Sequence, residues 1–378
     1  MHLYLHIPFC KQACHYCDFH FSTNQTLKAE LVAAMAHEIH LRADYLPTRH
    51  LETIYFGGGT PSLLTEAELA QLFDAIHQQF TVAPQAEITL EANPDDLLPD
   101  KLTMLRRYVN RLSVGIQTFD ESTLRWMNRA HTATEAKQCV RLAREAGFDN
   151  LSVDLIYGIP NRAEDRWQAD LEQALALDVP HISAYSLTIE PNTAFGRRQQ
   201  KGKLQPTEDS LAAEHFEQLV HALTGAGYEH YEIANFAKPG CYARHNSAYW
   251  QRRPYLGIGP AAHSYNGHSR QYNVAHNPRY ITGLRKATLH SGQIPAEREE
   301  LTPADQVNEY LLTGLRTKWG CRIEELNHLL GSDFLAVNRL AVEKLQTAGW
   351  LLIDKGVLRL TEAGKLFADR VAAELFVD

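Results

Sequence analysis

The sequence lacks several features that would place it outside the globular class. No apolar run approaches the roughly 18 consecutive residues that a membrane-spanning helix needs. There is no low-complexity segment and no exact repeat, and 44% hydrophobic with 22% charged residues is close to the average of folded domains. A long basic run is also missing, and 45 acidic against 37 basic residues give a formal charge of -8. Disordered, collagenous and membrane-spanning classes are therefore disfavoured, and nucleic acid is not expected as the main partner.

Cysteine is scarce, and half of it lies in one place. Of six cysteines, Cys10, Cys14 and Cys17 fall within eight residues, whereas the other three are solitary. The N-terminus has neither a cationic leader nor an apolar stretch long enough for a signal core. We therefore expect the mature chain to begin here, in the cytoplasm, where a cysteine cluster indicates metal ligation rather than disulfides.

Over roughly the first 225 residues, short apolar runs alternate with amphipathic helical stretches. This alternation is typical of parallel strands joined by crossover helices. The predicted strands span residues 3–7, 51–56, 86–92, 111–115, 151–156 and 181–187. The predicted helices span residues 27–46, 66–80, 133–146, 166–177 and 210–223. Thr65 and Glu68 form a capping-box pattern before the second helix. Six such units are too few for a closed eight-stranded barrel and predict a partial, TIM-like (β/α)6 barrel of the α/β class.

Two further segments follow the predicted barrel. Residues 227–300 are rich in Tyr, His, Asn and Gly, which predicts irregular structure with short strands covering the barrel mouth. Residues 301–378 predict a compact α+β unit, with helices over 305–316, 323–330 and 333–348 and then a two-stranded wing. This unit resembles a winged helix, but only Arg339, Lys344 and Lys355 lie near its last helix and wing, so DNA binding is not expected. The predicted domains are 1–226, 227–300 and 301–378.

Polar or glycine-rich positions follow the predicted strands at regular intervals. They are Cys10, residues 57–60, Glu91 with Asn93, Gln117 and Asp154. The carboxyl ends of the strands form the reactive face of a (β/α) barrel, so these residues should meet there.

The spacing C-x3-C-x2-C of the clustered cysteines indicates an iron–sulfur site. Three thiolates cannot ligate all four irons of a 4Fe-4S cubane, so one iron keeps an open position at which a small molecule can bind. The alternative is a structural zinc site completed by His15 or His20. A loop directly after a barrel strand favours the open cluster.

Six motifs resemble those of the radical S-adenosylmethionine (SAM) superfamily, and more closely the group of oxygen-independent coproporphyrinogen III oxidase and the HemW-type haem chaperones. They are YLHIPFCKQACHYCDF from Tyr4, GGGTPS from Gly57, LEANPD from Leu90, SVGIQTFD from Ser113, MNRAHT from Met127 and SVDLIYGIP from Ser152. The resemblance covers nearly the whole chain. It implies a partial radical SAM barrel with a 4Fe-4S cluster on Cys10, Cys14 and Cys17 and with SAM at the open iron.

The same resemblance implies which residues hold SAM. The implied set is Tyr4, Tyr16, Gly58, Gly59, Thr60, Glu91, Gln117, Arg129 and Asp154. The glycines would let the backbone approach the methionyl ammonium, and Arg129 would pair with the methionyl carboxylate. Glu91, Gln117 and Asp154 would accept hydrogen bonds from the ammonium and the ribose hydroxyls. Of this set, Glu91 and Asp154 are the assignments we favour most, because burying a carboxylate in a strand without a partner costs free energy of folding.

Two departures point away from the oxidase within this group. The oxidases carry a further cysteine where this chain has Phe19, and they have an extension ahead of the first strand. The sequence HNSAYW at residues 245–250 is similar to the H-N-x-x-Y-W pattern of the chaperones, which would make His245 a haem ligand. The alternatives are that His245 only holds a loop over the barrel mouth, or that His230, His263 or Cys241 is the ligand.

The sequence thus predicts a cytoplasmic haem chaperone that carries a 4Fe-4S cluster and SAM and transfers haem to apo-haemoproteins, with respiratory-chain enzymes among the candidate acceptors. A homodimer, a peripheral membrane contact and a role for SAM cleavage stay open. The rivals are a coproporphyrinogen III oxidase that works by radical SAM decarboxylation, against which Phe19 argues, and a zinc-dependent winged-helix regulator.

Overall fold

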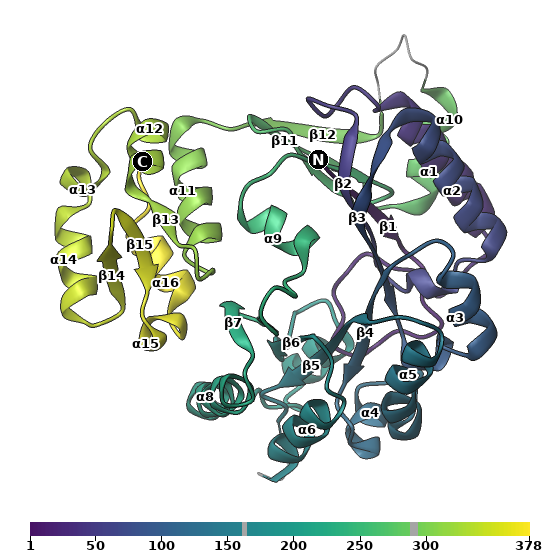
Figure 1. The fold of residues 1–378 in the computed structure, drawn as a ribbon, viewed down its shortest axis with the longest axis horizontal. Coiled ribbons are helices and arrows are strands. Elements are labelled where there is room, and N and C mark those ends of the chain that lie inside the picture. The colour runs from purple at the N-terminus through teal and green to yellow at the C-terminus, as the bar shows by residue number, and fades with distance from the viewer. Residues whose placement is uncertain (161–164, 288–293) are drawn as a thin grey trace.

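The computed structural model describes residues 1–160, 165–287 and 294–378. Six parallel strands stand side by side in chain order: β1 (His2–Ile7), β2 (His50–Gly58), β3 (Thr81–Ala92), β4 (Arg111–Gln117), β5 (Asn150–Tyr157) and β6 (His181–Ser186). The connecting helices pack on the outer side of this sheet (Figure 1). They are α1 (Lys28–Leu41), α2 (Glu66–Gln79), α3 (Pro99–Leu105), α4 (Glu121–Trp126), α5 (Ala133–Glu145), α6 (Asp165–Ala176) and α8 (Asp209–Gly225), with the short α7 (Ala194–Gln200) between β6 and α8. The predicted six-unit partial barrel is confirmed.

Each barrel strand has an apolar face toward the helices and a polar face toward the barrel interior. In β1, Leu3, Leu5 and Ile7 are buried in the hydrophobic core. The alternate residue His2 contacts the Thr53 hydroxyl of β2 through its Nδ1 at 2.9 Å. Because side chains alternate along a strand, the interior of this barrel is lined by polar groups along its length.

Residues 227–287 and 294–300 extend the sheet at both edges. β8 (Asn235–Ala237) pairs with β6 and carries β7 (Glu229–Glu232), while β9 (Tyr255–Ile258) lies parallel to β1 and is followed by β10 (His263–Tyr265), β11 (Ser269–Asn273) and β12 (Ala296–Glu300). The prediction that this segment covers the barrel mouth was wrong. An open barrel leaves two unpaired strand edges, and these short strands satisfy their backbone groups.

The helix α9 (Arg244–Trp250) enters the barrel from the opposite end to the mouth. Its residue His245 contacts Thr53, in the amino-terminal half of β2, and Glu87, which lies beside Thr53 in β3. Figure 1 shows α9 on the inner side of the sheet, between the barrel and the C-terminal domain.

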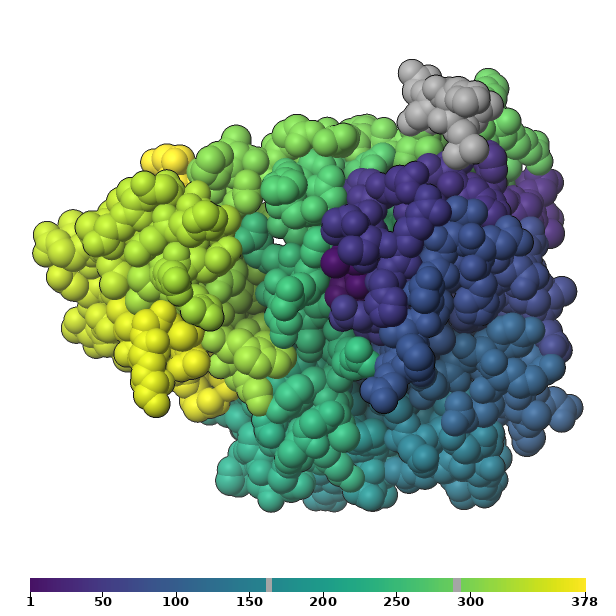
Figure 2. All heavy atoms as spheres, turned by 45° about the horizontal axis from the view of Figure 1, so that its top comes forward, coloured from purple at the N-terminus to yellow at the C-terminus, as the bar shows by residue number. Residues whose placement is uncertain are grey.

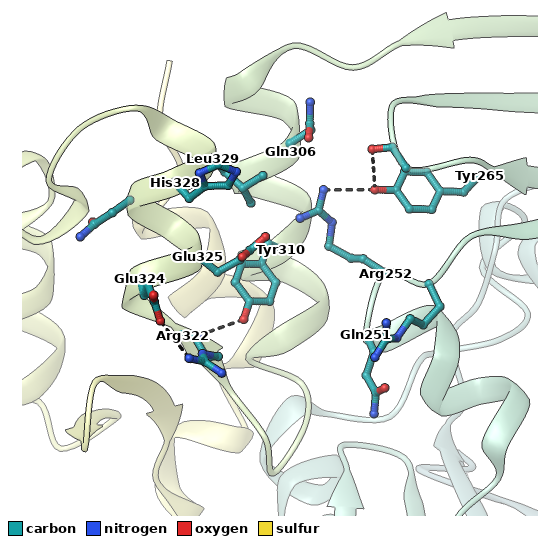
Figure 3. Close-up of a pocket in the computed structure, with 13 residues that line it drawn as sticks. Gln251, Arg252, Tyr265, Gln306, Tyr310, Arg322, Glu324, Glu325, His328 and Leu329 are labelled. Atoms are coloured by element: carbon teal, nitrogen blue, oxygen red, sulfur yellow. Dashed lines mark hydrogen bonds and ion pairs between the residues drawn. The ribbon is translucent and has the colours of Figure 1, made fainter. Parts of the chain in front are cut away.

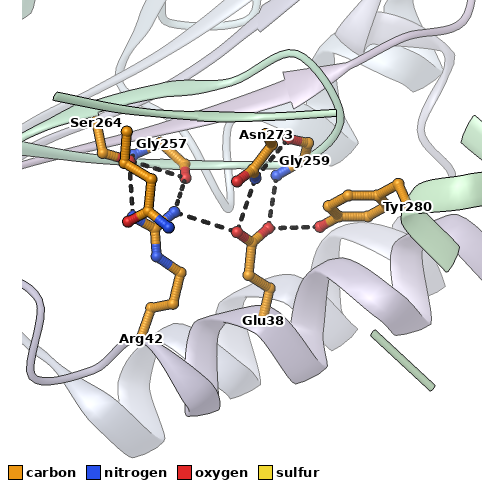
Figure 4. Close-up of polar contacts among 8 residues, drawn as sticks. Glu38, Arg42, Gly257, Gly259, Ser264, Asn273 and Tyr280 are labelled. Carbon is orange, nitrogen blue, oxygen red and sulfur yellow. Dashed lines mark hydrogen bonds and ion pairs between the residues drawn. The ribbon is translucent and has the colours of Figure 1, made fainter. Parts of the chain in front are cut away.

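A buried ion pair joins α1 to the added strands (Figure 4). The Glu38 carboxylate, which is 0% exposed, accepts hydrogen bonds from Arg42 at 3.2 Å and from Tyr280 at 2.6 Å. It also accepts from the Gly259 N–H at 2.9 Å and from Asn273 at 2.7 Å. α1 and the β9–β11 region are therefore held together by polar contacts as well as by apolar packing, in which α10 (Asn277–Lys286) takes part.

The C-terminal domain has a hydrophobic core of its own. It contains α11 (Pro303–Gly314), β13 (Cys321–Arg322), α12 (Ile323–Leu330), α13 (Phe334–Val337), α14 (Arg339–Thr347), β14 (Leu351–Asp354), β15 (Val357–Leu360), α15 (Glu362–Lys365) and α16 (Ala368–Glu374). Its three-stranded antiparallel sheet has the order β13-β15-β14, so the winged-helix-like prediction is confirmed. The helix predicted over 333–348 is two helices, which meet at Asn338. Figure 2 shows this domain, in yellow-green, as a lobe beside residues of the connecting segment. Within the described ranges, no helix is both long and apolar enough to cross a membrane.

Candidate cluster and cofactor site

A cavity of about 480 Å³ opens at the carboxyl ends of the barrel strands. It gathers most of the residues that the sequence singles out: Cys10, Cys14, Tyr16, Cys17, Gly58, Gly59, Thr60, Glu91, Gln117, Arg129 and Asp154. These residues come from the four strands β2 to β5, from the loop after β2 and from the two loops around the cysteines and Arg129. The expectation that they meet at one end of the barrel agrees with this geometry.

The cysteine loop directly follows β1 and is held against residues 126–129. The His15 N–H donates to the Met127 carbonyl at 2.9 Å, and the Gln12 amide donates to the Asn128 carbonyl at 2.9 Å. The three clustered cysteines are free thiols and are partly buried. Burial raises the pKa of the Cys17 thiol to about 12, so a metal that binds there must displace its proton.

Two side chains donate hydrogen bonds to the cysteine sulfurs. The Thr60 hydroxyl donates to Cys10 Sγ at 3.4 Å, and Arg129 Nη1 donates to Cys14 Sγ at 3.3 Å. Such donors suit sulfur atoms that carry negative charge, as the thiolate ligands of iron do. The donor set therefore fits a cluster held by three cysteines.

The two histidines of the zinc alternative are engaged elsewhere. His15 Nδ1 donates to the Trp126 carbonyl at 2.8 Å, and His20 Nε2 contacts Asn277 Oδ1 at 2.8 Å. Among residues 1–160, 165–287 and 294–378, no three His, Cys, Asp or Glu side chains are grouped to hold a single metal ion. This geometry disfavours a mononuclear zinc site at the N-terminus.

Arg129 has a guanidinium with unused capacity at the cavity wall. Its Nη2 donates to Asn93 Oδ1 at 2.6 Å and to the Gly115 carbonyl at 2.7 Å. Its Nε is buried without a hydrogen-bond partner, and none of the described carboxylates forms an ion pair with it. A guanidinium fixed by neutral acceptors can still pair with the carboxylate of a ligand.

Two carboxyl groups of the cavity have altered acidity. Burial raises the pKa of Glu91 from 4.5 to about 7, against the opposing effect of the Tyr55 hydroxyl, which donates to it at 2.8 Å. Burial also raises the pKa of Asp154 from 3.8 to about 6, against a hydrogen bond from Ser183. An ammonium or hydroxyl group of a ligand would supply the partners that favour the charged forms.

The glycines beside Glu91 are required by the packing beneath them. A Cβ on Gly58 would lie 2.6 Å from His6 Cε1, and its φ of +106° is one that other residues rarely adopt. A Cβ on Gly59 would lie 2.8 Å from the Phe9 carbonyl oxygen. The Gly58 N–H donates to Glu91 Oε2 at 3.1 Å, so the glycine loop also orients the carboxylate.

Two residues of the predicted set lie outside the cavity. Tyr4 is below it, where its hydroxyl contacts His6 Nδ1 at 3.1 Å and its ring stacks on Tyr55 at 6.1 Å. His245 is at the far end of the barrel and is 1% exposed. Its Nδ1 contacts the Thr53 hydroxyl at 2.6 Å and its Nε2 contacts the Tyr249 hydroxyl at 2.8 Å.

The environment of His245 does not suit an iron ligand. Both of its ring nitrogens are used, and burial lowers the pKa of its imidazole well below 6.5. Of the rival ligands, His230 contacts the Ile233 carbonyl and Lys365, whereas His263 is exposed with its ring against Tyr272. Cys241 is partly buried. Coordination through either ring nitrogen of His245 would require the hydrogen bond at that nitrogen to break.

The cavity also contains residues that the predicted set omits. Asn93 bonds Arg129, and Tyr185 at the end of β6 and Phe19 in the cysteine loop line the opening. Asn93 follows the predicted strand 86–92 and was expected at this end of the barrel, although the resemblance did not include it among the SAM-binding residues. Tyr185 carried no motif, and only its position near a strand end could have indicated it.

Comparisons with known proteins agree with this architecture. The model of the radical SAM superfamily matches residues 4–174, and the model of the HemN C-terminal domain matches residues 301–367. A solved structure titled coproporphyrinogen III oxidase (HemN) from Escherichia coli superposes with a TM-score of 0.85 at 23% identity, over 99% of this chain and 89% of that one. This likeness shows the fold.

Curated relatives match over almost their full length. The heme chaperone HemW of Bacillus subtilis is 34% identical over 97% of this chain and 97% of its own. The heme chaperone HemW of Escherichia coli is 34% identical over 99% of this chain and 97% of its own. Fold and site together define a radical SAM protein with a HemN-type C-terminal domain. Within that class, the chain belongs to the HemW family.

Proposed function

We propose that this chain binds haem and transfers it to apo-haemoproteins, with a 4Fe-4S cluster and SAM held at the mouth of its barrel. The support for haem as the cargo is full-length similarity to proteins named heme chaperone HemW. Respiratory-chain enzymes in the cytoplasm or at its membrane face are the proposed acceptors.

The observation that carries the cofactor assignment is the cavity at the strand ends. It combines three thiols, an arginine with no carboxylate partner among the described residues and two acids of raised pKa. In this proposal Cys10, Cys14 and Cys17 would hold the cluster, which would offer one open iron to SAM. The proposal needs SAM as a bound ligand and needs no cleavage step.

The residues of the cavity then have separate tasks. Arg129 pairs its positive charge with the methionyl carboxylate, because no carboxylate of the described residues neutralises it and its Nε has no acceptor. Glu91 and Asp154 accept hydrogen bonds from the ammonium and the ribose hydroxyls, and the ligand's positive charge favours their ionised forms. Tyr16, which receives a hydrogen bond from Arg129 at 3.4 Å, helps to close the wall beside Cys14.

Coproporphyrinogen III oxidase is the alternative that shares this fold. Phe19 stands where the oxidases carry a further cysteine, and its side chain is 67% exposed at the cavity opening. An exposed phenyl ring offers neither a thiol nor a polar contact to a tetrapyrrole carboxylate. We therefore expect no decarboxylation of coproporphyrinogen III.

One anaerobic preparation tests these assignments together. After reconstitution with iron and sulfide, we expect about four irons and four sulfides per chain, SAM binding, a Soret band on haem titration and no protoporphyrinogen from coproporphyrinogen III. The Cys14→Ser variant should lose the cluster and keep its circular dichroism spectrum. Absence of labile sulfide would reject the cluster, absence of haem binding would reject the cargo, and formation of protoporphyrinogen would establish the oxidase.

A further inference from the structure

We propose that His245 is a positioning residue of the SAM site: its ring supports Tyr55, whose hydroxyl orients the Glu91 carboxylate toward the ligand. This inference rests on the proposed function, because it needs SAM at the mouth of the barrel. It gives the HNSAYW segment a task inside the barrel that requires no contact with iron.

The Glu91 carboxylate is fixed by two donors, one on each oxygen. The Tyr55 hydroxyl donates to Oε1 at 2.8 Å, and the Gly58 N–H donates to Oε2 at 3.1 Å. A carboxylate has about four lone-pair positions, so both oxygens can still accept a hydrogen bond from a ligand. The two donors therefore set the direction in which Glu91 faces the cavity.

The Tyr55 ring is confined by its neighbours. The His245 ring stacks on it with centroids 5.0 Å apart and an interplanar angle of 29°, and the Tyr4 ring lies at 6.1 Å and 28°. The backbone also approaches this ring closely, since a Cβ on Gly57 would lie 2.9 Å from Tyr55 Cε1. The hydroxyl of Tyr55 therefore keeps its place beside Glu91 as long as these neighbours keep theirs.

His245 is itself fixed at three polar atoms. Its Nδ1 contacts the Thr53 hydroxyl at 2.6 Å, and its Nε2 contacts the Tyr249 hydroxyl at 2.8 Å. Its backbone N–H donates to Glu87 Oε1 at 3.0 Å. A ring whose rotamer is locked by packing and hydrogen bonds is suited to hold a second side chain in place. His245 therefore acts as a rigid wall behind Tyr55.

The helix that carries His245 is also held at its other end. Arg252 follows the C-cap of α9 with a φ of 54°, a left-handed conformation that strains any residue with a side chain. Its Nη2 donates to the Tyr265 hydroxyl at 3.2 Å, and its Cζ lies 5.8 Å from the centre of the Tyr310 ring. Figure 3 shows Arg252 between these two rings. Contacts at both ends of α9 therefore keep His245 against Tyr55.

Support and iron ligation predict different effects of substituting His245. As a support, the residue acts through Tyr55 and Glu91, so its loss weakens SAM binding and leaves haem binding unchanged. As an iron ligand, its loss alters haem binding and leaves SAM binding unchanged.

The test measures SAM affinity by equilibrium dialysis on the full chain after anaerobic reconstitution, with iron and sulfide content as the check on the cluster. For Tyr55→Phe we expect about tenfold weaker SAM binding at unchanged cluster content, as loss of one hydrogen bond to a charged group predicts. For His245→Ala we expect about fivefold weaker binding, because the Tyr55 side chain gains freedom that the ligand must remove. Tyr157→Phe, at a partly buried tyrosine of β5 outside the cavity wall, is the matched control and should bind like the parent chain.

Two further variants show whether His245 acts through Tyr55. The double variant Tyr55→Phe/His245→Ala should bind SAM no more weakly than Tyr55→Phe alone, because the support has no effect once the hydroxyl is gone. His245→Phe keeps a ring against Tyr55 and has no nitrogen to bind iron, so it should restore SAM affinity to within about twofold of the parent chain. Haem titration of His245→Phe should give the Soret band of the parent chain.

The outcomes separate this inference from the proposed function. A parent chain that assembles the cluster and binds no SAM rejects the function. A parent chain that binds SAM, together with unchanged affinity in Tyr55→Phe, rejects the positioning of Glu91 and leaves the function standing. Additive losses in the double variant, or a His245→Phe variant as weak as His245→Ala, would show that His245 does not act through Tyr55. A changed Soret band in His245→Phe would make the histidine an iron ligand and would also overturn the inference.

Discussion

Replacement of Glu38 by alanine should destabilise the barrel strongly. The side chain is fully buried and its two oxygens accept four hydrogen bonds, from Arg42, Asn273, Tyr280 and the Gly259 N–H. The Arg42 side chain is 4% exposed, so the substitution leaves a buried cation without its ion partner. Loss of one partner of a buried ion pair costs about 3–5 kcal/mol, a large share of the roughly 5–15 kcal/mol that stabilises a typical domain.

The remaining contacts of Arg42 reduce the free-energy cost of losing Glu38. Its guanidinium also donates to the Gly257 carbonyl at 3.0 Å and to Gln271 Oε1 at 2.9 Å, which keeps the cation partly satisfied. We therefore expect about 3 kcal/mol for Glu38→Ala and less for Glu38→Gln, which keeps the size of the side chain and one acceptor oxygen.

Urea unfolding followed by circular dichroism measures this effect as a shift of the midpoint. The control is Glu145→Ala, which breaks the exposed pair with Arg141 (57% and 61% exposed) and should cost less than about 1 kcal/mol. The double variant Glu38→Ala/Arg42→Ala should cost less than the sum of the single changes, because it removes the stranded cation. Equal costs for Glu38→Ala and Glu145→Ala, or strict additivity of the double variant, would refute the reasoning.

Three further predictions concern the site and its supports. Burial raises the pKa of Glu91 from 4.5 to about 7. The neutral carboxyl therefore stabilises the cofactor-free chain fully below pH 4.5, and this stabilisation is lost as the pH rises through 7. Thermal unfolding measured between about pH 5 and pH 8 should show the decline in stability, and Glu91→Gln should make the pH dependence flatter. Thr60→Val removes the donor to Cys10 Sγ and should make the reduction potential of the reconstituted cluster more negative at unchanged iron content; an unchanged potential in a redox titration monitored by electron paramagnetic resonance would contradict the assigned hydrogen bond. Thr65→Ala breaks a capping box with Glu68 and should cost about 1 kcal/mol in urea unfolding, whereas Thr65→Ser should retain most of the stability.

Local patterns in the sequence sufficed for the six barrel units and for much of the site. Thr65 caps α2 as the capping-box pattern predicts, and helix 323–330 has the predicted bounds. Each barrel strand is a run of apolar residues that ends at Gly, Pro or polar residues. The polar residues that follow the strands lie at one end of the barrel, because all the parallel strands end there. Glu91 and Asp154 were identifiable for that reason.

The parts that sequence reasoning misplaced depend on contacts between distant residues. β9 has only four residues, and its partner β1 lies at the start of the sequence. No local pattern therefore distinguishes β9 from a loop. The position of His245 is decided by Thr53, Glu87 and Tyr249, whose hydrogen bonds hold it inside the barrel. The strain at Arg252 was equally invisible, since a positive φ at an arginine has no signature in the sequence.

The pairing of β1 with β9 has a consequence for biosynthesis. β1 lies at the start of the chain, and the strand that completes its second edge is made only when residues 255–258 leave the ribosome. At the usual translation rate of roughly 5–20 residues per second, that delay is on the order of ten to fifty seconds. During this time a bare strand edge and three free thiols lie next to each other on the nascent polypeptide, so aggregation and oxidation threaten the same short stretch.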